Sequence, residues 1–382
     1  MVCCETAYEG AEACNSGVGF LASHGNPGSL EYLLGYRYGE VALPMKQTTD
    51  MTITVNTSGV NRALVIRRVG PTCRGMCLPT PDRKHCWTTI HSLRNRMCRD
   101  VPNPEKGILR EFRSFVRLWL RRNLEPLRFD EILSFDEWLS QTNYNEARKS
   151  ELQKVWDNHV CERPTGKFTQ VKCHIKDESY PSFKACRSIF SRHDYFKCYY
   201  GRFMKSIEDK VFKHPAFIKK IPIPDRPEYI RERLGNRKKY VITDYTAFES
   251  SFSPEFIRVC EGQLYHYMLK LLPGVAYEYS RVMCGLNDCV FKNVGIKIRG
   301  KRMSGEMSTS LANGFSNMMI MEFLCSRVGS TCRGVFEGDD GLCVVDGPVP
   351  EESSFNSLGF TIKLEVVNEF SNASFCGFVA DP

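Results

Sequence analysis

Hydrophobic and polar positions follow two different periods along this chain, and each period predicts a different type of element. From residue 106 to about 155, apolar residues recur at intervals of three and four, which predicts amphipathic helices. The first of these helices pairs an apolar stripe with an arginine-rich face. Residues 239–244 form a short β-type run, and residues 332–346 form two apolar runs around a Gly-Asp-Asp-Gly turn. An Asp-Gly pair between such runs is typical of a β-hairpin. The chain is therefore expected to be α+β.

Carboxylates stand where these predicted strands end. Asp244 closes the run 239–244, and Asp339 and Asp340 sit at the tip of the hairpin. After Asp244, the sequence Ser253-Pro254-Glu255 has an N-cap residue, a first-turn proline and an early acid, so a helix should run to about Leu272. Aspartate and glycine are also ordinary turn residues, and the hairpin acids alone need no functional explanation.

Two further stretches carry polar side chains that could bind a ligand. A Ser304-Gly305 loop precedes a helix with an apolar stripe, and Thr309, Asn313 and Asn317 lie off that stripe, where they could face a cleft. Buried polar groups need partners, and a ribose hydroxyl is one candidate. Residues 161–202 interleave basic and aromatic side chains, a mixture that can contact phosphates and bases but is also common on ordinary surfaces.

Composition and charge narrow the class of protein. At 382 residues and 42% hydrophobic, the chain can bury a large core, and its formal charge of +8 favours a polyanionic partner. The 18 cysteines are scattered and no secretory leader precedes them, so we expect reduced thiols in an intracellular protein. A zinc site around Cys73 and Cys77 remains an alternative reading. No run of about 18 apolar residues occurs, so a membrane-spanning segment is not expected.

The order of these features resembles a known family. Asp244, then Ser304-Gly305 with Thr309 and Asn313, then Asp339-Asp340 is similar to motifs A, B and C in the palm of viral RNA-dependent RNA polymerases. The segment from Lys176 through Lys184 to Arg187 resembles motif F, Lys363 resembles motif D, and Phe375-Cys376-Gly377 resembles motif E. The likeness is to plus-strand RNA viruses, in particular the tombus-like and noda-like group.

The resemblance implies roles for these residues. Asp244, Asp339 and Asp340 would hold Mg²⁺, with Mn²⁺ as a substitute, for a two-metal nucleotidyl transfer. Asp339 is expected to be indispensable and Asp340 more tolerant. Lys363 would protonate the leaving pyrophosphate. The incoming nucleotide would be bound by basic groups and by the residues that read its ribose: Lys176, Lys184, Arg187, Glu249, Ser304, Gly305, Thr309 and Asn313. The family usually has Asp where Glu249 stands.

The implied architecture is a right hand with fingers and palm, the palm being an antiparallel sheet backed by helices. We expect residues 1–105 to be an N-terminal extension or fingertips and 106–239 to be fingers including motif F. Residues 240–260 would carry palm motif A, 261–302 a fingers insertion and 303–382 palm motifs B to E. Only five residues follow Gly377, so the thumb is expected to be absent or truncated.

The resemblance also implies partners and a location. The partners would be RNA template and product, ribonucleoside triphosphates, and other viral replication proteins that supply membrane attachment. The location would be the host cytoplasm, at membrane-associated replication complexes. A reverse transcriptase is the nearest rival, although that family usually has an aromatic residue where Glu249 stands. A non-catalytic RNA-binding protein would also explain the basic charge, and it would not need the acids.

Overall fold

The computed structural model describes residues 51–55, 65–68, 77–80, 86–159, 162–176, 178, 186–237, 239–292 and 294–379. These residues form helices and mainly antiparallel sheets, which agrees with the expected α+β class. They divide into two compact units, each described here by itself. The zinc alternative lies partly outside the described residues, since Cys73 is not among them. No described helix has the length and apolar composition needed to cross a bilayer.

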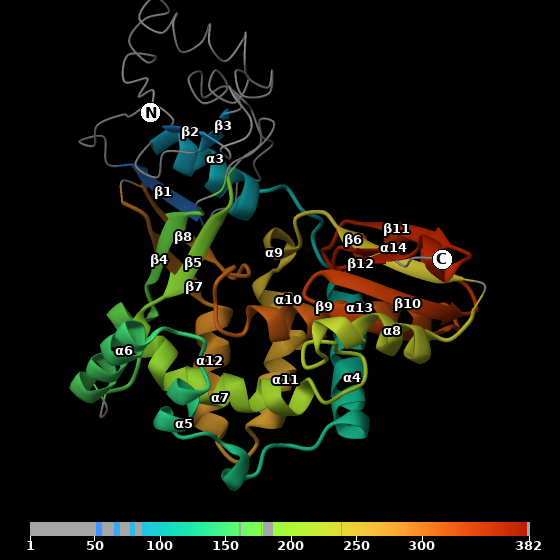
Figure 1. Ribbon diagram of the computed structural model, residues 1–382, viewed down its shortest axis with the longest axis horizontal. Helices are drawn as coiled ribbons and strands as arrows, with labels where there is room; N and C mark the ends of the chain where they lie inside the picture. The colour runs from blue at the N-terminus through green and yellow to red at the C-terminus, as the bar shows by residue number, and fades with distance from the viewer. Residues whose placement is uncertain are drawn as a thin grey trace, which may run out of the picture. The chain divides into compact units, whose positions relative to one another are not determined.

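The first unit contains residues 1–100, 170–191 and 287–298, and it is built on a mixed five-stranded sheet (Figure 1). The strand order is β1-β8-β7-β4-β5, with β1 antiparallel to β8 and β4 parallel to β7. The strands are β1 (Met51–Val55), β8 (Val294–Arg299), β7 (Leu286–Val290), β4 (Val171–Ile175) and β5 (Ser188–Arg192). A two-stranded sheet of β2 (Val65–Arg68) and β3 (Cys77–Thr80) and the helix α3 (Cys86–Met97) complete the described part.

The second unit contains residues 101–169, 192–286 and 299–382, and its centre is a four-stranded antiparallel sheet. The strand order is β11-β6-β10-β9. These strands are β11 (Ile362–Val367), β6 (Tyr240–Tyr245), β10 (Asp340–Asp346) and β9 (Thr331–Glu337). The predicted hairpin is therefore confirmed as β9 and β10, and the predicted strand ending near Asp244 is β6. Two short strands, β12 (Ser374–Phe375) and β13 (Phe378–Val379), pair with each other.

Each face of this sheet has its own core, because successive side chains of a strand point to opposite faces. Val241 and Tyr245 of β6 join a large cluster with the helix α13 (Thr309–Arg327), whose residues 311–321 are all buried. Tyr240 and Ile242 join a smaller cluster with the helix α8 (Arg226–Leu234). The sheet is thus a layer between two sets of helices.

Further helices surround this core. The helix predicted from residue 106 is α4 (Lys106–Asn123), which buries Phe112 and Trp119 against the core and exposes its arginines. The helix expected from Pro254 is interrupted at Cys260, which has φ −102° and ψ −95°, and becomes α10 (Pro254–Val259) and α11 (Glu261–Met268).

The other helices of this unit are α5 (Phe135–Ser140), α6 (Glu146–His159), α7 (Asp194–Val211), α9 (Phe248–Ser251), α12 (Pro273–Met283) and α14 (Glu352–Asn356). Its short 3-10 turns are η1 (Phe129–Glu131), η2 (Gly166–Thr169), η3 (Ile223–Asp225) and η4 (Phe370–Asn372).

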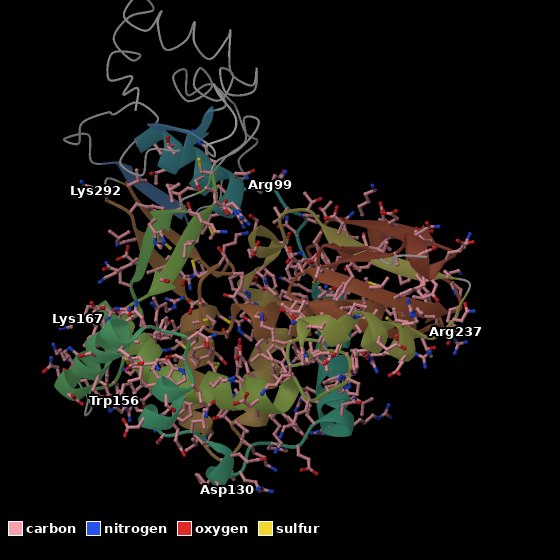
Figure 2. All side chains as sticks on the ribbon, viewed as in Figure 1. Arg99, Asp130, Trp156, Lys167, Arg237 and Lys292 are labelled. Carbon is pink, nitrogen blue, oxygen red and sulfur yellow. The ribbon has the colours of Figure 1, made fainter. Side chains whose placement is uncertain are left out.

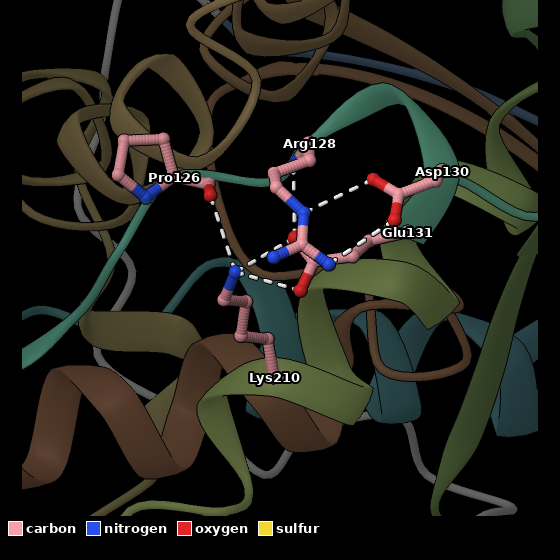
Figure 3. Close-up of polar contacts among 5 residues, drawn as sticks. All are labelled: Pro126, Arg128, Asp130, Glu131 and Lys210. Carbon is pink, nitrogen blue, oxygen red and sulfur yellow. Dashed lines mark hydrogen bonds and ion pairs between the residues drawn. The ribbon is translucent and has the colours of Figure 1, made fainter.

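Aromatic and charged contacts join helices that are distant in sequence. Trp156 of α6, labelled in Figure 2, stacks on Phe135 of α5 with ring centroids 4.6 Å apart. Lys210 of α7 donates to both Glu131 carboxylate oxygens, at 2.7 and 2.9 Å, and to the Pro126 carbonyl at 3.2 Å (Figure 3). These contacts hold the segment between α4 and α5 against α7.

Cysteine side chains contribute to the cores, as expected for reduced thiols. Cys260, Cys325 and Cys343 lie in the large cluster, and Cys198 lies in a smaller one between α5, α6 and α7. None of these four forms a disulfide. Cys376 is exposed.

Candidate active site

The register of the four-stranded sheet gathers charged side chains from all four strands in one row. Lys363 is paired with Asp244 and Asp340 is paired with Glu337, while Gly341 opposite Thr243 places Asp340 next to Asp244. Asp244 follows Tyr240 and Ile242 at alternate positions, so the row lies on the face of the sheet that α8 covers. Asp244, Asp340 and Lys363 are exposed at its end. The structure thus brings two of the three predicted metal-binding acids side by side.

The third acid, Asp339, lies in the tight turn between β9 and β10. Gly338 has φ +63°, a left-handed conformation that glycine adopts without steric cost. The Asn317 amide of α13 donates to the Asp339 backbone carbonyl at 2.9 Å and so ties this turn to the helix. The Asp339 side chain is exposed beside Asp340.

Asp340 has a different environment from its neighbour. Desolvation raises the pKa of its carboxyl, and the negative charges of Asp339, Asp244 and Glu337 raise it further. A hydrogen bond from the Cys376 thiol acts in the opposite direction. The negative charges of Asp339 and Asp244 thus act on the Asp340 carboxyl at this end of the sheet.

The loop and helix predicted to contact ribose are largely occupied with protein partners. Thr309 Oγ1 donates to the carbonyls of Met303 and Glu306 at 3.1 and 2.9 Å, which closes the loop before α13. Asn313 is buried, with 3% of its surface exposed, and its Oδ1 accepts a hydrogen bond from Arg302 Nε at 3.0 Å. Ser304 is half-buried, and Gly305 is exposed with φ +120°. Thr309 Oγ1 and the Asn317 amide nitrogen thus bond to the protein backbone, while Asn317 Oδ1 has no hydrogen-bond partner among the described residues. That α13 presents polar groups to a cleft stays a prediction.

Two buried ion pairs, which sequence reasoning missed, support this loop. Arg302 pairs with Glu261 of α11, and Arg192 pairs with Glu306 at 2.5 Å; both arginines have only 2% of their side chains exposed. Although desolvation acts to lower it, the charge of Glu261 raises the pKa of Arg302, which stays protonated. Breaking a buried pair leaves an uncompensated charge and is strongly destabilising. Nothing in the local sequence around these four residues pairs them.

Glu249, the other predicted ribose contact, follows motif A in the short helix α9. Its carbonyl accepts a hydrogen bond from the backbone N–H of Arg302 at 3.3 Å, and its side chain is half-buried. Ala247 just before α9 has φ +50°, an uncommon conformation for a residue with a Cβ. The connection after Asp244 therefore bends sharply and brings Glu249 to the loop that precedes α13.

The predicted phosphate-binding residues belong to the first unit. Lys176 N–H donates to the Arg187 carbonyl at 2.8 Å, and both cationic side chains bind Glu178, Lys176 at 2.5 Å. Glu178 thus neutralises part of the charge expected to meet a triphosphate. Lys184 lies outside the described residues.

The donor set at the hairpin fits a hard divalent cation. Carboxylate oxygens are the ligands that Mg²⁺ prefers, and this ion completes its shell with water and substrate phosphates. Among the described residues, no three His, Cys, Asp or Glu side chains are grouped so that they could hold a metal ion. Asp244, Asp339 and Asp340 therefore match Mg²⁺ in the chemistry of their donor atoms.

Comparison with known proteins identifies the family. The family described as "Viral RNA dependent RNA polymerase" matches residues 88–378. A relative, the "RNA-directed RNA polymerase" of Panicum mosaic virus (strain United States/Kansas 109S), is 24% identical over 269 residues, which cover 64% of this chain. The match spans 26% of that relative's length. The resemblance to polymerases of plus-strand RNA viruses is confirmed, and this chain belongs to the viral RNA-dependent RNA polymerase family.

Proposed function

We propose that this chain synthesises RNA from ribonucleoside triphosphates on an RNA template and so replicates the genome of a plus-strand RNA virus. The observation that carries the proposal is the gathering of Asp244, Asp339 and Asp340 at one end of the antiparallel sheet. In this proposal the second unit's sheet and α13 form the palm, and the basic segment with Lys176, Lys184 and Arg187 belongs to the fingers.

The three acids would hold two divalent ions, Mg²⁺ or Mn²⁺. When bound, such ions stabilise the attacking and leaving oxygens of an in-line displacement. Asp244 and Asp339 would be the main ligands, and Asp340 would add negative charge beside them. Lys363 lies opposite Asp244 in the sheet and would give a proton to the departing pyrophosphate. Lys176, Lys184 and Arg187 would offset the charge of the triphosphate.

Choice of sugar is the second part of the proposal. A 2′-hydroxyl is both a donor and an acceptor, and Glu249 and Asn313 supply an acceptor and a donor of the matching kinds. The backbone hydrogen bond from Arg302 to Glu249 and the side-chain bond from Arg302 to Asn313 support their action at one place.

The test is incorporation of labelled ribonucleotides on a defined RNA template with and without Mg²⁺. We expect metal-dependent extension by the unaltered chain and none by Asp339→Ala. Asp346→Ala is the matched control, because Asp346 lies exposed at the opposite end of β10. Extension by Asp339→Ala at the unaltered rate would contradict the proposal, and RNA binding without extension by the unaltered chain would favour a non-catalytic RNA-binding protein. A preference for deoxynucleotides would favour a reverse transcriptase.

The proposal extends to location and partners. This polymerase would act in the host cytoplasm at membrane-associated replication complexes, where other viral replication proteins supply attachment. Support comes from the family alone. Flotation of membranes from cells that make this chain alone, or with the other replication proteins, tests it: we expect flotation only in the second case.

A further inference from the structure

We propose that Arg302 is a positioning residue for sugar selection, whose side chain orients the ribose-reading Asn313 and whose backbone bonds to Glu249, without contacting the nucleotide. This inference rests on the proposed function. Arg302 bonds to both residues, by its backbone to Glu249 and by its side chain to Asn313. Its backbone N–H donates to the Glu249 carbonyl at 3.3 Å, and its Nε donates to Asn313 Oδ1 at 3.0 Å.

Arg302 determines which way the Asn313 amide faces. A guanidinium carries only donors, so the carboxamide must turn its oxygen toward Arg302. The Asn313 NH₂ group then lies on the opposite side of the carboxamide, where it can donate to a 2′-oxygen. Glu249, when ionised, can only accept, and it would take the hydrogen of the same hydroxyl. A deoxynucleotide would leave both groups without this partner.

Two further neighbours, Glu261 and Phe252, hold the Arg302 guanidinium. Glu261 forms a buried ion pair with Arg302, and the Phe252 ring lies 4.4 Å from its central carbon. The Glu261 side chain is fully buried, so neither charge can leave the pair for water at low cost. Arg302 therefore has one orientation available, and so does the amide that it binds.

The experiment measures kcat/KM for a ribonucleotide and for the deoxynucleotide with the same base, on one RNA template. Arg302→Lys keeps a positive charge for Glu261 but lacks Nε and the planar fork. We expect the preference for the ribonucleotide to fall about tenfold, the effect of one hydrogen bond, through a lower ribonucleotide kcat/KM. The deoxynucleotide value should change little.

A second variant separates loss of the hydrogen bond to Asn313 from loss of folding. Replacing both charges, as Arg302→Met with Glu261→Met, removes the bond to Asn313 without leaving a lone buried charge, and such replacements are often neutral for stability. The same fall in preference is expected. In an Asn313→Ala background, Arg302→Lys should cause no further fall, because the two residues act through one contact.

Arg192→Lys is the matched control. Arg192 is as buried as Arg302 and pairs with Glu306 of the same loop, but it binds the Thr169 carbonyl in place of Asn313. This variant should lower the thermal midpoint without changing the sugar preference. An unchanged preference in folded Arg302 variants would overturn the inference, and so would an equal fall in Arg192→Lys. If the unaltered chain extends RNA without preferring ribonucleotides, the proposed reading by Glu249 and Asn313 fails instead.

Discussion

Lys363 and Asp244 lie directly opposite each other on the adjacent antiparallel strands β11 and β6. Cross-strand partners point to the same face, so the ammonium group stands beside a predicted metal ligand. We expect Lys363→Ala to slow nucleotide addition by about 10²- to 10⁴-fold, the usual worth of a positioned proton donor, without stopping it. Rapid-quench measurement of one addition, at saturating nucleotide, gives this rate.

Lys363→Arg separates proton transfer from simple charge. Arginine keeps a positive charge opposite Asp244 but does not deprotonate in proteins. The rate should stay low in this variant. Full activity in Lys363→Arg would show that the charge alone is required.

The two hairpin aspartates should respond differently to loss of charge. The Asp340 carboxyl already accepts a hydrogen bond from Cys376, whereas the Asp339 side chain extends from an exposed turn. We expect Asp339→Asn to remove detectable extension and Asp340→Asn to retain a reduced rate with a greater Mn²⁺ requirement. Extension assays across a Mg²⁺ and Mn²⁺ series compare them, and retention of RNA binding by both checks the fold. The reverse order of sensitivity would contradict the assignment of Asp339 as the main ligand.

Gly341 should resist substitution for a steric reason. A Cβ at this position would lie 2.7 Å from Thr243 Oγ1, closer than real contacts allow, and 3.0 Å from Phe336 Cδ1, which is a tight contact. We expect Gly341→Ala to destabilise the fold by ~2 kcal/mol, because overpacking shifts β10 against β6. Gly107→Ala on α4 is the control, since nothing lies within 4 Å of its Cβ and alanine favours helix. Urea unfolding of both variants measures the difference.

His214 should make the fold sensitive to acid. Desolvation, with a smaller contribution from the Arg233 charge, lowers its pKa to about 4, and Nδ1 accepts a hydrogen bond from the Ala216 N–H at 3.3 Å. Between pH 6.5 and 4 the unfolded chain therefore binds the extra proton, and stability falls as pH falls through that range. When the pH falls from 7.5 to 5, the free energy of unfolding should fall by about 2 kcal/mol less in His214→Gln than in the unaltered chain, allowing for the partial exposure of His214.

Comparing the variant with the unaltered chain at each pH is necessary because other groups act in the opposite sense. Desolvation raises the pKa of Glu208 and of Glu322 to about 7, so the stability that each gives is lost as pH rises through that value. Thermal melts at pH 5 and pH 7.5 isolate the His214 contribution. A pH-independent difference between the two proteins would contradict it.

The structural features that could be predicted from the sequence are those that residues close together in the chain specify. The turn glycines and flanking apolar runs specify the β9–β10 hairpin, and Ser253 caps α10 by accepting a hydrogen bond from the Phe256 N–H, as expected. The periodic stripe of α4 likewise buries Phe112 and Trp119. These features depend on residues only a few positions apart.

Features that depend on distant residues could not be predicted. Arg302 and Glu261 are 41 positions apart, and no local pattern pairs them. The opposition of Lys363 and Asp244 follows from strand register, which two short apolar runs do not specify. The Asn313 carboxamide oxygen and the Asn317 amide nitrogen bond to Arg302 and to the Asp339 carbonyl, partners that only the tertiary structure supplies. Roles for the predicted site residues and the boundaries of fingers and palm stay predictions.

Local opening of this fold can be followed by chemical labelling of the cysteines that are buried in its cores. Desolvation raises the pKa of Cys198 to about 12, and Cys260 is shifted in the same direction, so neither forms the reactive thiolate while its cluster is closed. Alkylation at Cys198 therefore reports opening between α5, α6 and α7, and alkylation at Cys260 reports opening at the junction of α10 and α11. Peptide mass mapping over a time course would time the two events separately in one sample.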